Sequence, residues 1–167
     1  LIADPESQTV DYLLTGPSGV DDATAIAKVT ALTNIVEERR DCIAFVSPRR
    51  ANVVGVSNTT TVTNNIVDFF DQLPSSSYVV FDSGYKYIYD KYNDVYRYVP
   101  CNGDIAGLCL QTTEEAEPWF SPAGFQRGNV RNAIKLAYSP NKTQRDTLYS
   151  KRVNPIVSFP GQGVVLF

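Results

Sequence analysis

A glycine turn at residues 16–19, of sequence GPSG, stands between an apolar stretch and a helix-like stretch, where a phosphate-binding loop would lie. A P-loop needs Lys followed by Ser or Thr after its second glycine, and a dinucleotide loop needs glycines in a GxGxxG register. Here Val20, Asp21 and Asp22 follow instead. Carboxylates at a helix N-terminus would occupy and repel the anion site that backbone amides create there. We interpret the turn as structural, and a nucleotide-handling α/β enzyme that uses it is an alternative.

General acid–base chemistry has few candidates in this chain. It contains no histidine, which excludes a Ser-His-Asp or Cys-His arrangement and any histidine-containing zinc site within these residues. Paired carboxylates can act as general acid and general base, and the chain has two such pairs, Glu114 with Glu115 and Asp90 with Asp94. We interpret them instead as the solvated ends of a helix and of a hairpin turn. We therefore predict no catalytic residue, no cofactor and no metal site, and a protein that is not an enzyme.

The cysteines, the charge and the apolar runs bear on the compartment of the protein and on binding to nucleic acid or membranes. The three cysteines, Cys42, Cys101 and Cys109, have no CxxC spacing and are predicted to be buried free thiols of a reducing cytoplasm. The formal charge is -3, and the basic residues are scattered, which is not the pattern of a nucleic-acid surface. No apolar run approaches the roughly 20 residues of a membrane span. We predict neither nucleic acid binding nor membrane insertion.

The elements that would position these residues follow from the spacing of apolar side chains. In the first half the pattern predicts strands over residues 11–15, 42–46 and 77–81, with helices over 21–39 and 61–73 between them. The run over 42–46 is continuously apolar, which is typical of a strand buried on both faces. Repeated strand–helix–strand units predict parallel strands joined by right-handed crossovers.

Tyrosines alternate with other residues on both sides of a turn at Asn93-Asp94, which predicts a β-hairpin. They are Tyr85, Tyr87, Tyr89, Tyr96 and Tyr98. Such a row favours the packed face of a sheet or a protein interface. The alternative is a sugar-binding face, which would make the protein a carbohydrate-binding module.

The second half is predicted to add a helix over residues 102–113 capped by Asn102, and a strand over 132–138. A helix over 140–150, capped by Ser139, precedes two final strands at 153–158 and 164–167. The expected fold class is α/β, a mixed β-sheet flanked by helices with a Tyr-rich β-hairpin. We expect one α/β domain over residues 1–167, and we expect it to be a fragment of a longer protein because the chain ends in an apolar run.

Three stretches of the second half carry a family resemblance. They are YVPCNGDIAG at residues 98–107, PWFSPAG at 118–124, and the ordered set QRDTLY, VNPI and SFPGQG within 144–163. In order and spacing these stretches resemble the conserved region of the tail sheath proteins of contractile-tailed bacteriophages. Their amino-acid sequence is similar to that of the sheath proteins of T-even-like phages. Residues 1–97 fit this family only through the order of their elements and the strand that ends at Val46-Ser47-Pro48.

The resemblance implies a structural subunit that polymerises around the tail tube and contracts to drive the tube through the host cell envelope. This chain would be the conserved inner α/β region of a larger multidomain subunit. The implied partners are other copies in a helical sheath, the tail tube protein, and the baseplate and tail terminator proteins. The implied location is the virion, after assembly in the host cytoplasm. The family offers no catalytic residues.

Charged residues on exposed helix ends are our candidates for contacts between copies. Such residues can form ion pairs that exchange when subunits rearrange, although any single one is worth little at a surface. The candidates are Asp21, Asp22, Glu37, Glu38, Arg39, Arg40, Arg49 and Arg50.

Overall fold

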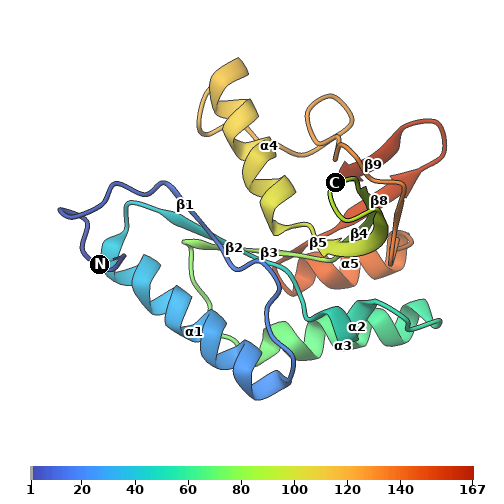
Figure 1. The fold of residues 1–167 in the computed structure, drawn as a ribbon, viewed down its shortest axis with the longest axis horizontal. Coiled ribbons are helices and arrows are strands. Elements are labelled where there is room, and N and C mark those ends of the chain that lie inside the picture. Colours follow the sequence, from blue (N-terminus) through green and yellow to red (C-terminus); the bar gives the residue numbers. More distant parts are fainter. Residues whose placement is uncertain (1) are drawn as a thin grey trace.

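A parallel four-stranded sheet with the order β1-β2-β3-β7 lies at the centre of the computed structural model, which describes residues 2–167 (Figure 1). Its strands are β1 (Tyr12–Leu14), β2 (Ile43–Val46), β3 (Val79–Asp82) and β7 (Val153–Asn154). All three pairings are parallel. The α/β class and the parallel strand–helix–strand units predicted from the sequence are confirmed.

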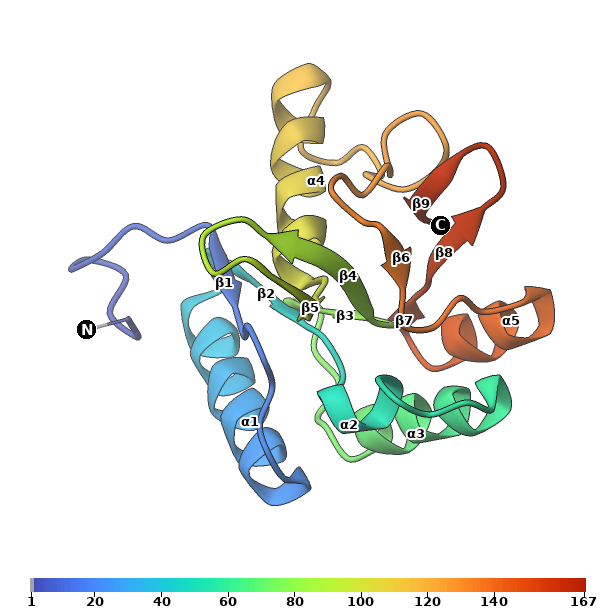
Figure 2. The same cartoon turned by 45° about the vertical axis from the view of Figure 1, so that its right-hand side comes forward.

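Helices cover both faces of this sheet. They are α1 (Asp22–Arg39), α2 (Arg50–Val53), α3 (Thr59–Asp71), α4 (Asn102–Glu115) and α5 (Lys142–Ser150). Both ribbon views place α1, α2 and α3 below the sheet, α4 above it, and α5 beside α3 (Figures 1 and 2).

Strand β2 shows why its sequence is apolar without interruption. Ala44 packs in one cluster with Val36 of α1, on the lower face. Phe45 points to the upper face and packs with Ile105 of α4. Val46 returns to the lower face, where it joins the large cluster of α1, α3 and α5 side chains. Because side chains alternate along a strand, burial on both faces requires all three of these positions to be apolar, whereas Ile43 at the start of β2 is exposed.

A second, antiparallel sheet with the order β5-β4-β6 adjoins the first. Its strands are β4 (Tyr85–Asp90), β5 (Val95–Pro100) and β6 (Lys135–Leu136). The last two strands, β8 (Ile156–Phe159) and β9 (Gly163–Leu166), pair with each other. The predicted tyrosine hairpin is confirmed. The strand predicted over residues 132–138 shrinks to two residues, and Asn132, with a φ of 56°, cannot be part of an extended strand.

Several helix boundaries differ from the sequence prediction. Helix α5 is capped by Asn141 and not by Ser139, because the Asn141 side chain accepts from the backbone N–H of Gln144 at 3.0 Å. Ser139 instead accepts from the backbone N–H of Ser158. Asn102 is the first residue of α4 and does not cap it.

The starts of two other helices also differ. Helix α3 begins at Thr59, before the predicted residue 61, because Asn58 accepts hydrogen bonds from the first backbone amides. Helix α2 was not predicted, since a single turn leaves no apolar period to detect. Of the three free cysteines, Cys42 and Cys101 are buried as predicted, while Cys109 is half-buried.

Candidate functional site

Buried polar side chains gather at the carboxyl ends of the parallel strands. Thr15 follows β1, Ser47 follows β2, and Asp82 ends β3, and all three are buried. In open α/β sheets, ligands bind outside this edge. Here the start of α4 covers it: the backbone N–H of Asn102 donates to Ser47 Oγ at 3.0 Å, and Asn102 Nδ2 donates to Thr15 Oγ1 at 3.1 Å. This polar junction therefore joins the parallel sheet to α4.

Asp82 is the acidic centre of the polar junction. Its Oδ2 accepts from Ser47 Oγ at 2.6 Å, and its Oδ1 accepts from the backbone N–H of Gly84 at 2.8 Å. Burial raises the pKa of Asp82 to about 7, although these two hydrogen bonds lower it. The carboxyl group thus holds the β3–β4 connection against the end of β2, with both oxygens engaged inside the chain. This arrangement fits a structural role.

A buried ion pair extends the polar junction into the second sheet. Lys86 Nζ of β4 lies 2.7 Å from Asp104 Oδ1 of α4 and also donates to the carbonyl of Arg131 at 3.0 Å. Burial raises the pKa of Asp104, while the hydrogen bond from Lys86 lowers it. The pair fixes α4 against the tyrosine hairpin.

Lys28 binds backbone carbonyls at the glycine turn of residues 16–19. Lys28 Nζ donates to the carbonyls of Thr15 and Pro17, at 2.6 and 2.9 Å. Asp21 Oδ1 accepts from the backbone N–H of Thr24 at 2.8 Å, and this bond is the main cause that lowers the pKa of Asp21. The carboxylate of Asp21 therefore engages the backbone amide of Thr24 in the first turn of α1. This geometry favours the structural interpretation of the turn over the nucleotide-binding alternative.

The candidate contact residues at the start of α1 belong to an ion pair within the chain. Asp22 pairs with Arg49, whose Nη2 also donates to the carbonyl of Val20 at 2.6 Å. Asp21 precedes the helix as its cap, and Arg50 is the exposed first residue of α2. These residues lie around one end of α1.

The candidates at the other end of α1 include a buried arginine. The expectation that Arg39 is exposed is wrong, since its side chain is 0% exposed. It pairs with Asp41 and donates to the carbonyls of Ile2 and Gln8, at 2.6 and 2.9 Å. The segment before β1 folds back over the helix end to accept these bonds, and nothing in the local helical pattern signalled this return.

The remaining candidates surround that helix end. Glu38 and Arg40 are exposed, and Arg40 Nε donates to the carbonyl of Glu37 at 3.2 Å. An α-helix rises about 1.5 Å per residue, so the 18 residues of α1 separate its two charged ends by roughly 27 Å. The structure thus brings the eight candidates together as two groups and not as one.

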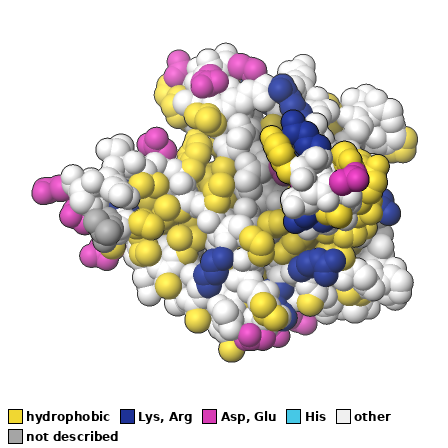
Figure 3. Space-filling model, in the orientation of Figure 1, with side chains coloured by type: hydrophobic (Ala, Val, Ile, Leu, Met, Phe, Trp, Pro, Cys, Tyr) yellow, Lys and Arg dark blue, Asp and Glu magenta, His cyan; other side chains and the backbone are white. Residues whose placement is uncertain are grey.

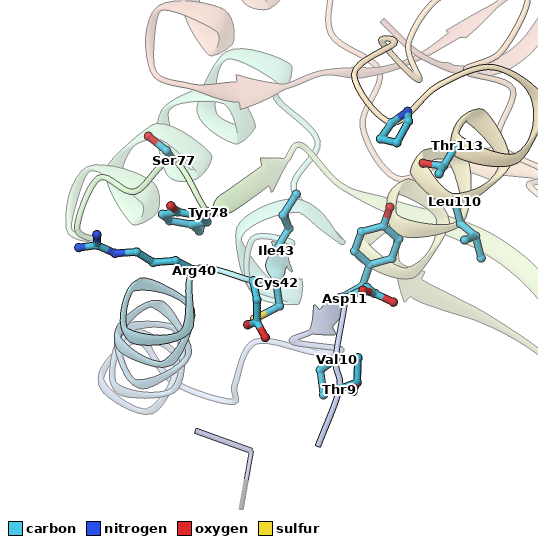
Figure 4. A pocket seen from close by; sticks show the side chains of 13 residues that line it. Thr9, Val10, Asp11, Arg40, Cys42, Ile43, Ser77, Tyr78, Leu110 and Thr113 are labelled. Carbon is cyan, nitrogen blue, oxygen red and sulfur yellow. The ribbon is translucent and has the colours of Figure 1, made fainter. Parts of the chain in front are cut away.

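A groove of about 880 Å³ opens at the amino ends of the strands (Figure 4). Arg40 from the end of α1 lies on one side of it, and Leu110 and Thr113 of α4 lie on the other. Ile43 of β2 lies between them. Tyr12 of β1 also lines the groove. Sequence analysis missed this groove, because it depends on the strand order and on the side of the sheet that α4 covers.

Four of the hairpin tyrosines form a cross-strand ladder. Tyr87 pairs with Tyr98, and Tyr89 pairs with Tyr96, with ring centroids 4.7 and 5.0 Å apart. The ring of Tyr85 is buried instead, and its hydroxyl donates to the carbonyl of Pro48 at 3.1 Å. Tyr85 is thus part of the packed interior, whereas the ladder rings stack on one another with Tyr89 46% and Tyr96 58% exposed. The choice between a packed or interface face and a sugar-binding face stays a prediction.

Metal and membrane chemistry find no support in the part of the chain that the structure describes. Within residues 2–167 no group of three or more His, Cys, Asp or Glu could hold a metal ion. No helix in the same range is long and apolar enough to span a bilayer.

Comparison with known proteins places these features in a family. Residues 6–167 match the family model described as the phage tail sheath protein central domain. The chain is 38% identical to the tail sheath protein of Vibrio phage KVP40, over an alignment that covers 100% of this chain and 27% of that protein. It is 39% identical to the tail sheath protein of Enterobacteria phage T4, with coverage of 99% and 26%. The chain thus spans about a quarter of the length of these relatives.

Solved structures show the same fold. A chain of the anti-feeding prophage baseplate superposes with a TM-score of 0.69 at 16% identity, over 97% of this chain and 38% of that one. A chain of the anti-feeding prophage helical sheath in its contracted state superposes with a TM-score of 0.62 at 17% identity, with coverage of 89% and 36%. With the family model matched over residues 6–167, the chain belongs to the phage tail sheath protein family.

Proposed function

We propose that the protein is a structural subunit of a contractile phage tail sheath, which polymerises around the tail tube and contracts to drive the tube through the host envelope. The observation that carries this proposal is the family match over residues 6–167. The superposition on a chain of a contracted helical sheath supports the fold that such a subunit needs. We propose that residues 1–167 form one α/β domain, which is the inner region of a larger multidomain subunit.

The proposed mechanism follows from how tightly the interior of this domain is packed and hydrogen-bonded. Both faces of the parallel sheet are packed, and the polar junction ties α4 to the strand ends through Asp82, Ser47 and Asn102. Packed interiors resist continuous deformation. The domain therefore moves as one body, and the free energy of contraction comes from contacts between copies.

The partners of the intact protein follow from this role. They are other copies of itself in a helical sheath, the tail tube protein, and the baseplate and tail terminator proteins. The protein is not an enzyme, binds no nucleic acid and inserts into no membrane. It belongs to the virion and assembles in the host cytoplasm.

The charged ends of α1 remain our proposed contacts between copies, with one change. Arg39 serves the fold of its own chain, so the contacts are left to Asp21, Asp22, Glu37, Glu38, Arg40, Arg49 and Arg50. Charge reversal of Arg49 and Arg50 tests this set, with Arg50→Glu alone as the variant that spares the ion pair of Asp22 with Arg49. Normal assembly and contraction of both variants would remove these residues from the contact.

Electron microscopy of the full-length protein tests the proposed function. A sheath subunit is expected to form tubes or rings with a regular repeat. Discrete monomers at every protein concentration and salt condition, together with turnover of a small molecule, would contradict the proposal.

A further inference from the structure

Charge is divided sharply between two consecutive segments of the chain. Residues 101–126 contain four acidic residues and no Lys or Arg, whereas residues 127–152 contain seven Lys or Arg and one acidic residue. The acidic residues of the first segment are Asp104, Glu114, Glu115 and Glu117. The basic residues of the second are Arg127, Arg131, Lys135, Lys142, Arg145, Lys151 and Arg152.

The acidic segment forms an exposed face at the end of α4. Glu114 lies one turn after Leu110 on the helix, and Glu115, Glu117 and Trp119 follow. Trp119 is 78% exposed and Leu110 is 51% exposed. Acidic side chains gather over this end of α4, with hydrophobic side chains close beside them (Figure 3). We call these five residues the acidic α4 face.

The basic segment forms a second exposed face along α5. Lys142, Arg145 and Tyr149 lie at positions i, i+3 and i+7 of that helix, which places them on one stripe. The guanidinium of Arg145 lies 5.3 Å from the ring centroid of Phe167, which is also within contact of Phe125. Tyr149, Phe125 and Phe167 are all exposed. We call these five residues the basic α5 face.

The charges of the two faces have no ion-pair partner among residues 2–167, although the acidic Asp146 lies beside Arg145 on α5. Within residues 2–167, the ion pairs involve none of Glu114, Glu115 and Glu117 and neither Lys142 nor Arg145. The charges at the ends of α1 differ in this respect, since Asp22 pairs with Arg49 and Arg39 pairs with Asp41. The exposed Trp119 and Tyr149 and the guanidinium of Arg145 are of the residue types enriched at interfaces. The unpaired charges around them can attract a partner surface of opposite sign.

The two faces are complementary in charge and point in different directions. The free end of α4 points away from α5 in both ribbon views (Figures 1 and 2). A contact between two different patches is heterologous, so it continues from copy to copy and builds a ring or a helix. We propose that copies of this chain associate head to tail, with the acidic α4 face of one copy docked on the basic α5 face of the next. This inference rests on the proposed function and names the surfaces that polymerisation uses.

Two variants of the full-length protein test the docking. The acidic-face variant is Glu114→Lys with Glu117→Lys, and the basic-face variant is Lys142→Glu with Arg145→Glu. Positive charge near the end of a helix and negative charge near its start are both compatible with the helix dipole. Like charges then face each other in each pure variant, and the protein concentration needed for assembly should rise by about tenfold or more. Lys142→Glu alone, which leaves the ring stacking of Arg145 intact, should act in the same direction with a smaller effect.

Mixing the two variants is the decisive step. In the mixture, the altered α4 face of one variant is positive and the altered α5 face of the other variant is negative, so these two faces attract each other. The two variants should therefore assemble together near the protein concentration at which the unaltered protein assembles. The control is Asp68→Lys with Glu6→Lys, two exposed carboxylates outside both faces, and it should assemble like the unaltered protein. Thermal melts of each variant check that folding is retained.

The outcomes separate the inference from the proposed function. If the unaltered protein forms no tubes or rings, the proposed function fails. If the unaltered protein assembles and either reversed variant assembles equally well alone, the docking fails and the function stands. A mixture that stays dispersed while both variants melt like the unaltered protein also overturns the docking.

Discussion

Arg39 and Asp41 form a two-pronged ion pair just past the end of α1, with Nε to Oδ1 and Nη2 to Oδ2 both at 2.9 Å. The same guanidinium holds the carbonyls of Ile2 and Gln8. The pair thus fixes the segment that precedes β1, and it explains how a residue at an expected surface position becomes buried.

Arg39→Lys is therefore expected to release this segment. A lysine has one compact ammonium group and cannot donate to Asp41 and to the carbonyls in the fork geometry of arginine. Limited proteolysis within residues 2–10 should accelerate by roughly tenfold, because local opening becomes easier. Arg40→Lys, an exposed change at the next position, is the matched control. Equal cleavage rates for the two variants would show that the ion pair does not hold the segment.

Asp82→Asn is expected to change how stability depends on pH. The folded pKa of Asp82 is about 7, above its ordinary value of 3.8. Its contribution to the free energy of unfolding is therefore fully present below about pH 4 and is lost as the pH rises through 7. The amide that replaces the Asp82 carboxyl group does not titrate, so the variant does not lose stability in this way as the pH rises. The difference in unfolding free energy between the variant and the unaltered protein should therefore change by on the order of 2–4 kcal/mol between pH 5 and pH 8. Urea unfolding at both pH values measures it. Parallel pH profiles would mean that Asp82 stays ionised throughout.

Lys86→Met is expected to destabilise the protein by about 2–4 kcal/mol. The substitution removes the cation that pairs with Asp104, whose carboxylate is largely buried. Adding Asp104→Leu removes the stranded charge, so the double variant should recover most of the loss. A double-mutant cycle by chemical denaturation gives the coupling energy. Additive effects of the two changes would show that the pair does not connect α4 to β4.

Tyr87→Ala is expected to cost about 1–2 kcal/mol of stability, since the ring contacts those of Tyr96 and Tyr98. Tyr92→Ala, at an 86% exposed position beyond the ladder, should change stability little. Thermal melts compare the two variants. If Tyr87→Ala left stability unchanged but abolished binding on a glycan array, the carbohydrate-binding alternative would replace the packing interpretation.

Local sequence patterns predicted the elements whose side chains carry a clear period. The continuous apolar run ending at Val46, the α1 stripe and the alternating tyrosines each report burial through spacing alone. The family resemblance in residues 98–167 then indicated the function class. The polar junction was out of reach, because Asn102 contacts Thr15 across 87 residues of sequence. No local pattern records such a contact.

Local sequence patterns also did not predict which of the charged candidate contact residues are buried. Arg39 and Arg40 are adjacent and chemically identical, yet one is buried by the returning segment and the other stays exposed. The division of charge between residues 101–126 and 127–152 can be read from the sequence, but the directions in which the two faces point depend on the placement of α4 and α5 in space.

Electron cryomicroscopy of a sheath formed by the full-length protein, in its extended and contracted states, can show whether this domain moves as one body. We expect residues 2–167 to superpose between the two states, with the polar junction of Asp82, Ser47 and Asn102 unchanged, while the contacts between copies differ. A sheath in which α4 separates from the parallel sheet during contraction, or in which the contacts between copies stay the same, would contradict this expectation.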